Sequence, residues 1–456
     1  MSTRTLCACV LAAWLAPLAS AQTATLPDDE SGIALAVHTE DKPALPGLLT
    51  KVGALWREPV GEVLPAADPP PPLRPTRFWI NNEVLMWWIE GMAVPNLVTT
   101  SPAGTSAGVA GVIGEPATTT VFPKGTVDNN MRFGGRSTIG AWLDDEARIG
   151  LEVQFLLLAS GGKEFGAASD GTAAGPILVR PVTNGVTNGQ AAEPIAIPGV
   201  SSGAIHITTS TSLIGAGFWF RERFCSSDDP CSTCRPCANG GCSSNGCASD
   251  WGSAWRCRFD SMFGYRYLRL GDHLAINDSI TAQVALNGLP AGSQLQRIDR
   301  FDSDNTFHGV DLGITGVVER GPWSLGVVTK IAVGANDSSV DILGARSVGG
   351  AVTGSGLLAQ SATNGGHFVR VQASAVPEID LKFGYILRPN LRLYADYTLL
   401  YWFNVLRAGN QVDVNVDPSF LLQGAATGGT PARPALSLQQ RDIWVQGISV
   451  GLVWSY

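Results

Sequence analysis

The stretch Ile149–Ala159, IGLEVQFLLLA, decides the fold. Apolar residues fall on every second position: Ile149, Leu151, Val153, Phe155, Leu157 and Ala159. The positions between them begin with Gly150, Glu152 and Gln154. Successive side chains of a β-strand point to opposite faces, so this period of two predicts a strand with one apolar and one polar face.

The same alternation recurs in 131–143, 255–267 and 379–387, and each time the charged residues share one face. They are Arg132 and Arg136 in the first stretch, Arg256, Arg258, Asp260 and Arg266 in the second, and Asp380 and Lys382 in the third. The opposite faces carry residues such as Phe133, Phe263 and Phe383. Repeated two-faced strands indicate either a soluble β-sandwich or a membrane barrel whose apolar face meets lipid.

The connections between these strands differ sharply in length. Three are tight: Asp144–Ala147, Gly321-Pro322 and Pro389-Asn390. Others are long and rich in Gly, Ser, Thr, Ala and Pro, and we place them at 91–130, 160–202, 272–304, 337–365 and 404–440. Alternating short and long connections are typical of outer-membrane barrels, with short periplasmic turns and long extracellular loops.

We therefore predict an all-β fold, an antiparallel transmembrane β-barrel of 10 to 14 strands. Ten strands follow if the first begins at Phe78 and the last ends at the C-terminus, which gives the even number that bacterial barrels have. The upper limit allows for 203–224 and 366–388 each being two strands.

The first 77 residues lie outside the predicted barrel. Residues 1–21 combine Arg4, an apolar run over 6–18 and the small residues Ala19-Ser20-Ala21, which is the pattern of a signal peptide. Residues 22–77 are proline-rich towards their end, with four consecutive prolines at 69–72, and we expect a largely disordered periplasmic segment. The barrel would occupy 78–456.

Composition supports an exported membrane protein without a nucleic-acid partner. Only 15% of the residues are charged and the net charge is −8, whereas nucleic-acid binding calls for a basic face. Beyond the signal, no window approaches the roughly 20 apolar residues of a transmembrane helix. We expect the outer membrane as the location and its lipid as a partner.

The last strand supports this location. Ile448, Val450, Leu452, Trp454 and Tyr456 form one apolar face that ends at the C-terminus. Gly451, Trp454 and Tyr456 resemble the C-terminal signal that the barrel-assembly machinery reads. Trp and Tyr also favour the membrane interface. An ordinary edge strand of a soluble sandwich is the alternative.

Several motifs resemble the putative beta-barrel porin family 7, a family of predicted outer-membrane barrels. They are Phe78-Trp79, Leu85-Met86-Trp87-Trp88, Pro95-Asn96-Leu97-Val98-Thr99-Thr100, Gly134-Gly135-Arg136, Gly140-Ala141-Trp142-Leu143-Asp144, Gly264-Tyr265-Arg266-Tyr267-Leu268 and Leu406-Arg407-Ala408-Gly409-Asn410-Gln411. The resemblance spans nearly all of the chain from 78 onward. It implies the location and the fold more firmly than it implies transport.

The polar faces predict which residues line the lumen. The candidates are Arg132, Arg136, Glu152, Arg256, Arg258, Asp260, Arg266, Asp311, Glu319, Lys330, Asp380, Lys382, Arg392 and Asp396. In a wide barrel, opposed charges would order polar solutes, which predicts a porin for passive diffusion of small hydrophilic solutes. By analogy with general porins, we also expect homo-oligomers. In a narrow barrel, the charges would pair and close the interior, which would leave a structural or surface-interaction barrel of the envelope.

Seven cysteines crowd into a predicted insert at 225–257: Cys225, Cys231, Cys234, Cys237, Cys242, Cys247 and Cys257. The spacing of Cys231, Cys234 and Cys237 resembles a metal-ligand run. Export through an oxidising compartment favours disulfides instead, with one thiol left over because seven is odd. A ten-strand topology places the insert at the short-turn rim, whereas a hairpin over 203–224 would move it outside.

An enzyme is the least supported class. Five histidines are present and none lies in a metal motif such as two histidines four residues apart beside a glutamate. His308 and Asp311 would project to opposite faces of one strand. We therefore expect no catalytic residues, no metal and no cofactor.

Overall fold

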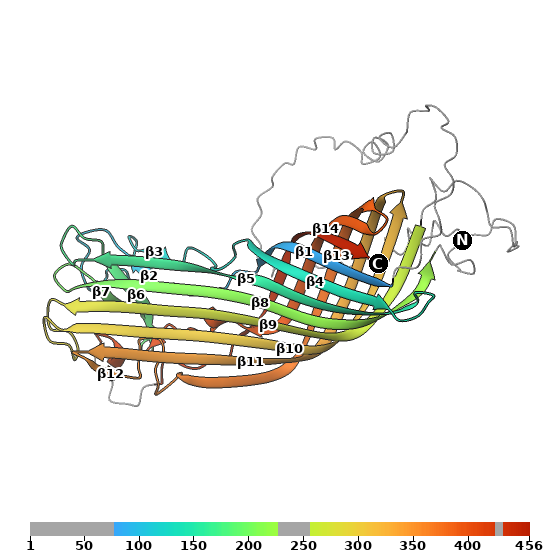
Figure 1. The fold of residues 1–456 in the computed structure, drawn as a ribbon. Coiled ribbons are helices and arrows are strands. Elements are labelled where there is room, and N and C mark those ends of the chain that lie inside the picture. Colours follow the sequence, from blue (N-terminus) through green and yellow to red (C-terminus); the bar gives the residue numbers. More distant parts are fainter. Residues whose placement is uncertain (1–76, 227–255, 425–431) are drawn as a thin grey trace, which may run out of the picture. The chain divides into compact units, whose positions relative to one another are not determined.

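The structure is a computed structural model that describes residues 77–226, 256–424 and 432–456. Ten antiparallel strands form one closed sheet (Figure 1). In chain order they are β1 (Phe78–Ile89), β4 (Arg132–Trp142), β5 (Ile149–Ser169), β8 (Ser201–Ser226), β9 (Arg256–Ala282), β10 (Gln294–Arg320), β11 (Trp323–Val348), β13 (Gly366–Arg388), β14 (Leu391–Leu406) and β16 (Gln440–Ser455). The last strand, β16, pairs with β1 and closes the ring. The predicted antiparallel barrel is confirmed, with ten strands.

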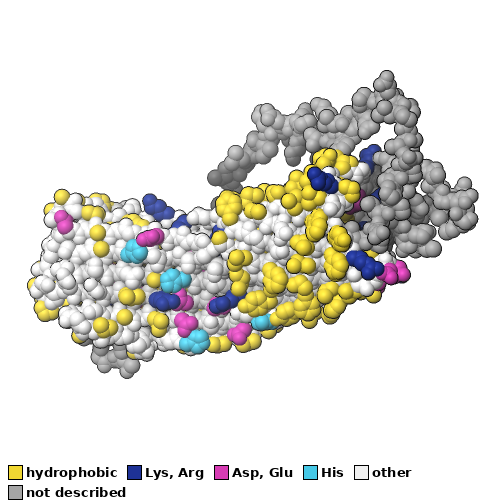
Figure 2. All heavy atoms as spheres, viewed as in Figure 1, with side chains coloured by type: hydrophobic (Ala, Val, Ile, Leu, Met, Phe, Trp, Pro, Cys, Tyr) yellow, Lys and Arg dark blue, Asp and Glu magenta, His cyan; other side chains and the backbone are white. Residues whose placement is uncertain are grey.

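The outer wall of the barrel changes from apolar to polar along the long strands, and β10 shows this most clearly. Val310, Leu312 and Ile314 are exposed on its outer side, whereas Arg300 and Asp302 follow on the same side further towards the N-terminal end of the strand. Figure 2 shows hydrophobic side chains gathered over one half of the wall and scattered charges and histidines over the next part. The apolar half, here called the apolar belt, fits the hydrocarbon-facing band of a membrane barrel.

The short turns lie at the strand ends where the chain also ends. β4 and β5 are joined through 143–148, where the Asp144 carboxylate accepts hydrogen bonds from the backbone N–H groups of Arg148 (2.9 Å) and Ile149 (2.7 Å). Gly321, at φ +56°, turns β10 into β11. Only Pro389-Asn390 separates β13 from β14. All three predicted tight turns are confirmed.

The predicted long connections are too long at several places. β5 continues to Ser169, inside the range 160–202 that we predicted to be a loop. β9 extends to Ala282 and β10 starts at Gln294, so the connection predicted over 272–304 shrinks to 283–293. These strand ends lie beyond the apolar belt. Without lipid outside, their outer wall carries polar and small side chains, and the alternating apolar signal is lost.

The segments that remain between the long strands fold into short elements. β2 (Val98–Thr100), β3 (Thr119–Phe122), β6 (Leu178–Asn184), β7 (Gln190–Ala196) and β15 (Asn415–Val416) form a second, small sheet. β12 (Ala351–Thr353) pairs with β11, and η2 (Ala408–Gln411) and η3 (Pro418–Phe420) are single 3₁₀ turns. The small sheet and the two 3₁₀ turns, but not the exposed β12, contribute apolar side chains to one buried cluster with inward residues of β8, β9, β10 and β11. These segments therefore pack into the barrel interior.

The structure settles the segments that could have been hairpins. Residues 203–224 lie within the single strand β8, and 366–388 form the single strand β13. The cysteine-rich insert thus joins β8 to β9 at the short-turn rim, and the hairpin alternative is wrong. Its residues 227–255 lie outside the described residues, as do the predicted signal peptide and the proline-rich segment up to residue 76. The disulfide and metal alternatives stay predictions.

The C-terminal strand places its apolar face outward. Ile448, Val450, Leu452 and Trp454 are exposed on the wall, and Tyr456 accepts backbone hydrogen bonds from Phe78 (3.0 Å). Gly451 faces inward, where a β-carbon would lie 2.6 Å from the Tyr394 hydroxyl. Within the described ranges, no helix is long and apolar enough to span a membrane.

An arginine in the apolar belt should destabilise the barrel far more than one beyond it. For Ile314→Arg we expect a loss of about 2–4 kcal/mol in the free energy of unfolding, because the side chain would sit in hydrocarbon. The matched control is Ile298→Arg, at an equally outward position of the same strand β10 but beyond the belt. Urea unfolding in lipid vesicles measures both. Equal losses would contradict the membrane position of the belt.

Candidate functional site in the barrel interior

The charged residues predicted for the lumen all lie on barrel strands, on positions of one parity in each strand. Nine of them are buried: Arg132, Arg136, Glu152, Asp260, Arg266, Asp311, Lys330, Asp380 and Asp396. Arg258, Glu319, Lys382 and Arg392 are partly buried, and Arg256 is exposed at the start of β9. The period-two pattern that turns apolar residues to the outer wall therefore turns these charges to the interior.

Arg136 lies at the centre of the first ionic network. Its guanidinium contacts carboxylates from three strands: Glu83 of β1 at 2.5 Å, Asp396 of β14, and Asp380 of β13 at 3.4 Å. The Tyr394 hydroxyl donates to Glu83 at 2.6 Å, and the Lys382 ammonium lies 3.5 Å from the same carboxylate. A buried charge is tolerated only when it is paired, so this network ties together opposite walls.

Arg266 lies at the centre of the second network. It contacts Asp311 at 2.7 Å and Glu378 at 2.5 Å, and the Lys330 ammonium reaches Glu378 at 2.7 Å. The Trp219 indole N–H also donates to Asp311, at 2.9 Å. The two networks place charges of both signs across the barrel axis, where they neutralise one another.

The sequence analysis missed two carboxylates that complete these networks, Glu83 and Glu378. Each lies on the predicted polar face, since Glu378 is two positions before Asp380 and Glu83 shares its parity with Asn81. Glu83 is the single charge in β1, where the adjacent Asn81 and Asn82 interrupt the alternation, and Glu378 follows Pro377. Extending the parity of each strand to its ends would have found both.

An apolar layer lies in the interior next to the ionic networks, on the side of the long connections. Nine of the ten barrel strands contribute to it, all except β4. Its members are Leu85, Trp87, Ile89, Leu156, Leu158, Leu213, Leu268, Leu270, Phe307, Ala332, Val376, Leu400, Trp402, Val405, Ile443 and Val445. The Phe307 and Trp402 rings meet edge to face, with centroids 6.1 Å apart, and both side chains are fully buried. Side chains thus fill the cross-section, as expected of barrels with few strands.

Beyond the apolar layer, polar residues hold the inward-folded segments. Arg132 donates to the backbone oxygens of Thr211 and Asp128, both at 2.6 Å, so it clamps a connection and does not join the central networks. Arg407 pairs with Asp272. In the connection between β3 and β4, burial raises the pKa of the Asp128 carboxyl, and a hydrogen bond from Thr209 and the charge of Arg132 offset part of this effect.

Buried ion pairs fix the small sheet to the barrel wall. Arg180 of β6 bridges Asp278 (2.8 Å) and Asp299 (2.7 Å), and Arg297 bridges Asp278 (2.9 Å) and Glu193 of β7 (2.5 Å). Asp299 also accepts three backbone N–H bonds from the segment 357–359, at 2.8 to 2.9 Å. These contacts join β6, β7 and the connection before β13 to the two strands β9 and β10.

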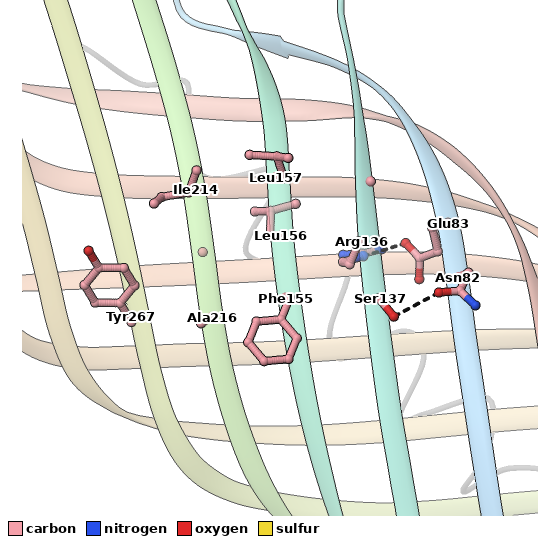
Figure 3. A pocket seen from close by; sticks show the side chains of 12 residues that line it. Asn82, Glu83, Arg136, Ser137, Phe155, Leu156, Leu157, Ile214, Ala216 and Tyr267 are labelled. Atoms are coloured by element: carbon pink, nitrogen blue, oxygen red, sulfur yellow. Dashed lines mark hydrogen bonds and ion pairs between the residues drawn. The ribbon is translucent and has the colours of Figure 1, made fainter.

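Two hollows remain. A polar cavity of about 390 Å³ lies inside the barrel between the ionic networks and the short-turn rim. A hollow of about 440 Å³ lies at the wall itself, and Figure 3 shows Phe155 and Tyr267 beside it, with the hydrogen bond from Ser137 to Asn82 (2.9 Å) at its edge. Arg136 and Glu83, seen in the same view, belong to the first ionic network.

A closed antiparallel sheet with an apolar belt outside and paired charges inside defines a transmembrane β-barrel of the outer-membrane class. The chain belongs to the family described as Putative beta barrel porin-7, which it matches over residues 79–456. This confirms the resemblance seen in the sequence. Among curated proteins, none matches.

Solved structures of outer-membrane proteins show a distant likeness. The outer membrane protease OmpT from Escherichia coli is 10% identical, with 84% of this chain and 97% of that chain covered and a TM-score of 0.35. The P. putida toluene transporter TodX is 8% identical, with 83% and 89% covered and a TM-score of 0.20. Likeness at this level says nothing about the activity of this chain.

Removal of the Arg136 guanidinium should strongly destabilise the barrel. In Arg136→Met, three carboxylates would face one another without this partner, and breaking a buried ion pair from one side costs about 3–5 kcal/mol. Arg269→Met is the control, because Arg269 pairs with Asp304 on the exposed outer wall and such pairs contribute roughly 0–1 kcal/mol. Urea unfolding followed by tryptophan fluorescence compares the two. Losses of similar size would show that the network does not hold the walls together.

Proposed function

We propose that this outer-membrane barrel has a closed axis and serves as a structural or surface-interaction element of the cell envelope. The observation that carries the proposal is the apolar layer, in which side chains of nine strands pack against one another across the interior. A hydrophilic solute or a hydrated ion would have to displace this packing and lose its water to pass.

The inward-folded segments, which lie beyond the apolar layer towards the long connections, support the same proposal. Crossing the axis would also require the small sheet to leave the interior, and therefore the release of Arg180 and Arg297 from buried carboxylates. We infer that the charged residues of the two central networks, around Arg136 and Arg266, stabilise the wall by pairing and do not line a conducting pore.

A porin for passive diffusion of small hydrophilic solutes is the second candidate. The family description and the polar cavity at the short-turn rim favour it. This function needs a second conformation, in which the apolar layer opens and the small sheet moves out of the barrel interior at the same time. Conduction in the described conformation is not part of our proposal.

The part of the wall beyond the apolar belt suits contact with other envelope material. It carries hydrogen-bonded polar pairs on adjacent strands, such as His273 with Asp302 at 2.5 Å and His367 with Asp341 at 2.8 Å. By the usual topology of such barrels, the short turns would be periplasmic and this part would face outward. The proposed partners of the whole protein are membrane lipid, further copies of the chain and the barrel-assembly machinery. This machinery would act on Gly451, Trp454 and Tyr456.

We propose no enzymatic activity. The four histidines in the described ranges, His206, His273, His308 and His367, lie on outward positions of four different strands. His308 points outward while Asp311 is buried inside, so these two do not form a catalytic pair. In the same ranges, no group of three or more His, Cys, Asp or Glu could hold a metal ion.

Planar-bilayer recording tests the closed axis. The purified full-length protein, inserted at high salt, should give no steady conductance, because no hydrated path crosses the apolar layer. A general porin of known conductance, inserted in the same bilayers, controls for insertion. Regular, salt-dependent current steps from this protein would overturn the closed axis and favour passive diffusion.

A further inference from the structure

Three arginines surround one buried carboxylate inside the barrel near the short-turn rim. Arg221 and Arg223 come from β8, and Arg258 comes from β9 beside Asp260. The Nε atom of each lies 3.5 Å from an oxygen of Asp260, whose side chain is 1% exposed. Arg223 is directly opposite Asp260 in the register of the two strands, and this register brings all four residues together.

The positive charge of this cluster exceeds the negative charge that faces it. Glu152 takes up part of the excess, since it contacts Arg221 at 2.7 Å. At 3.5 Å the contacts to Asp260 are longer than good hydrogen bonds of about 2.7–3.2 Å. Among the described residues, neither the three Nε atoms nor the two Asp260 oxygens have a hydrogen-bond partner. Glu319 also acts on Arg258, but it is paired with Arg392, so within the described part of the chain the three cations of the cluster face two anions and one positive charge is left over.

The cluster borders open space. Arg221, Arg223 and Arg258 all line the interior cavity of about 390 Å³, which Arg388 and Arg392 line as well. Arg392 is already neutralised by Glu319 at 2.6 Å. The Trp142 ring lies against Arg223, with 4.4 Å between the guanidinium carbon and the ring centroid, and this contact holds that side chain in place. A guanidinium group is planar and can donate two parallel hydrogen bonds to a pair of oxygens of a phosphate or a carboxylate, so guanidinium groups fixed around a cavity suit such anions.

We propose that this arginine pocket, formed by Arg221, Arg223, Arg258 and Asp260, binds a small oxyanion that carries a phosphate or carboxylate group. The anion enters the cavity from the short-turn rim and supplies the negative charge that Asp260 and Glu152 leave uncompensated. The apolar layer lies on the far side of the ionic networks, so the anion is bound and not passed on. Binding itself does not depend on whether the axis is closed.

Titration calorimetry on the full-length protein in detergent micelles tests this proposal. Inorganic phosphate, and separately acetate, is added at constant pH and ionic strength, with chloride as the background anion. We expect saturable binding at one site, and a roughly tenfold weaker affinity in Arg258→Gln, because one charge-assisted contact is lost. Arg258 is partly exposed, which favours folding of the variant.

Arg269→Gln is the matched control, since it removes the same charge from the exposed outer wall and should bind as the unaltered protein does. Tighter binding of phosphate than of acetate identifies a phosphate group as the preferred ligand chemistry, and the reverse order identifies a carboxylate. The proposal is overturned if neither anion saturates a site, or if Arg258→Gln and Arg269→Gln lose the same affinity. Either result leaves the bilayer recording unaffected.

Discussion

A ring of ten strands is so narrow that inward side chains from opposite walls meet. This constraint governs the rest of the structure, because the period of two sends half of all strand residues to the interior whatever their chemistry. An inward charge must then find a counter-charge across the axis, as Arg136 of β4 does with Glu83 and Asp396. Inward apolar residues at the next level pack against one another and form the apolar layer. The ionic networks and the apolar layer thus have the same origin.

The faces of the strands could be predicted from the sequence because lipid and the interior demand different side chains. In 149–159, Phe155 and Leu157 lie exposed on the outer wall, and Glu152 is buried inside. The tight turns could also be predicted from the sequence, because Asp144, Gly321 and Pro389 act through local backbone chemistry. These two local signals predicted the antiparallel order and limited the number of strands to 10 to 14, of which the barrel has ten.

Where the strands end could not be predicted in the same way. Past the apolar belt, both sides of a strand meet polar surroundings or small residues, and the alternation that marks a strand fades. The ion-pair partners in the interior could not be predicted for a different reason. Arg136 and Asp396 are 260 positions apart, and only the order of strands around the ring brings them together. Arg132 donates hydrogen bonds to Thr211 of β8 and to Asp128. These contacts likewise depend on how the connection between β3 and β4 folds inward.

Pairing of β16 with β1 has a consequence for how the protein is made. The backbone N–H of Phe78 bonds to the carbonyl of Tyr456, so the two ends of the barrel sequence complete one another. Until β16 has formed, β1 and β14 each present an open edge that could pair with any other extended chain. Bringing ends that are nearly four hundred residues apart together is also a slow, non-local event. A chain in which β16 has not yet paired is therefore exposed to pairing with the wrong strand, and closure of the ring removes both open edges.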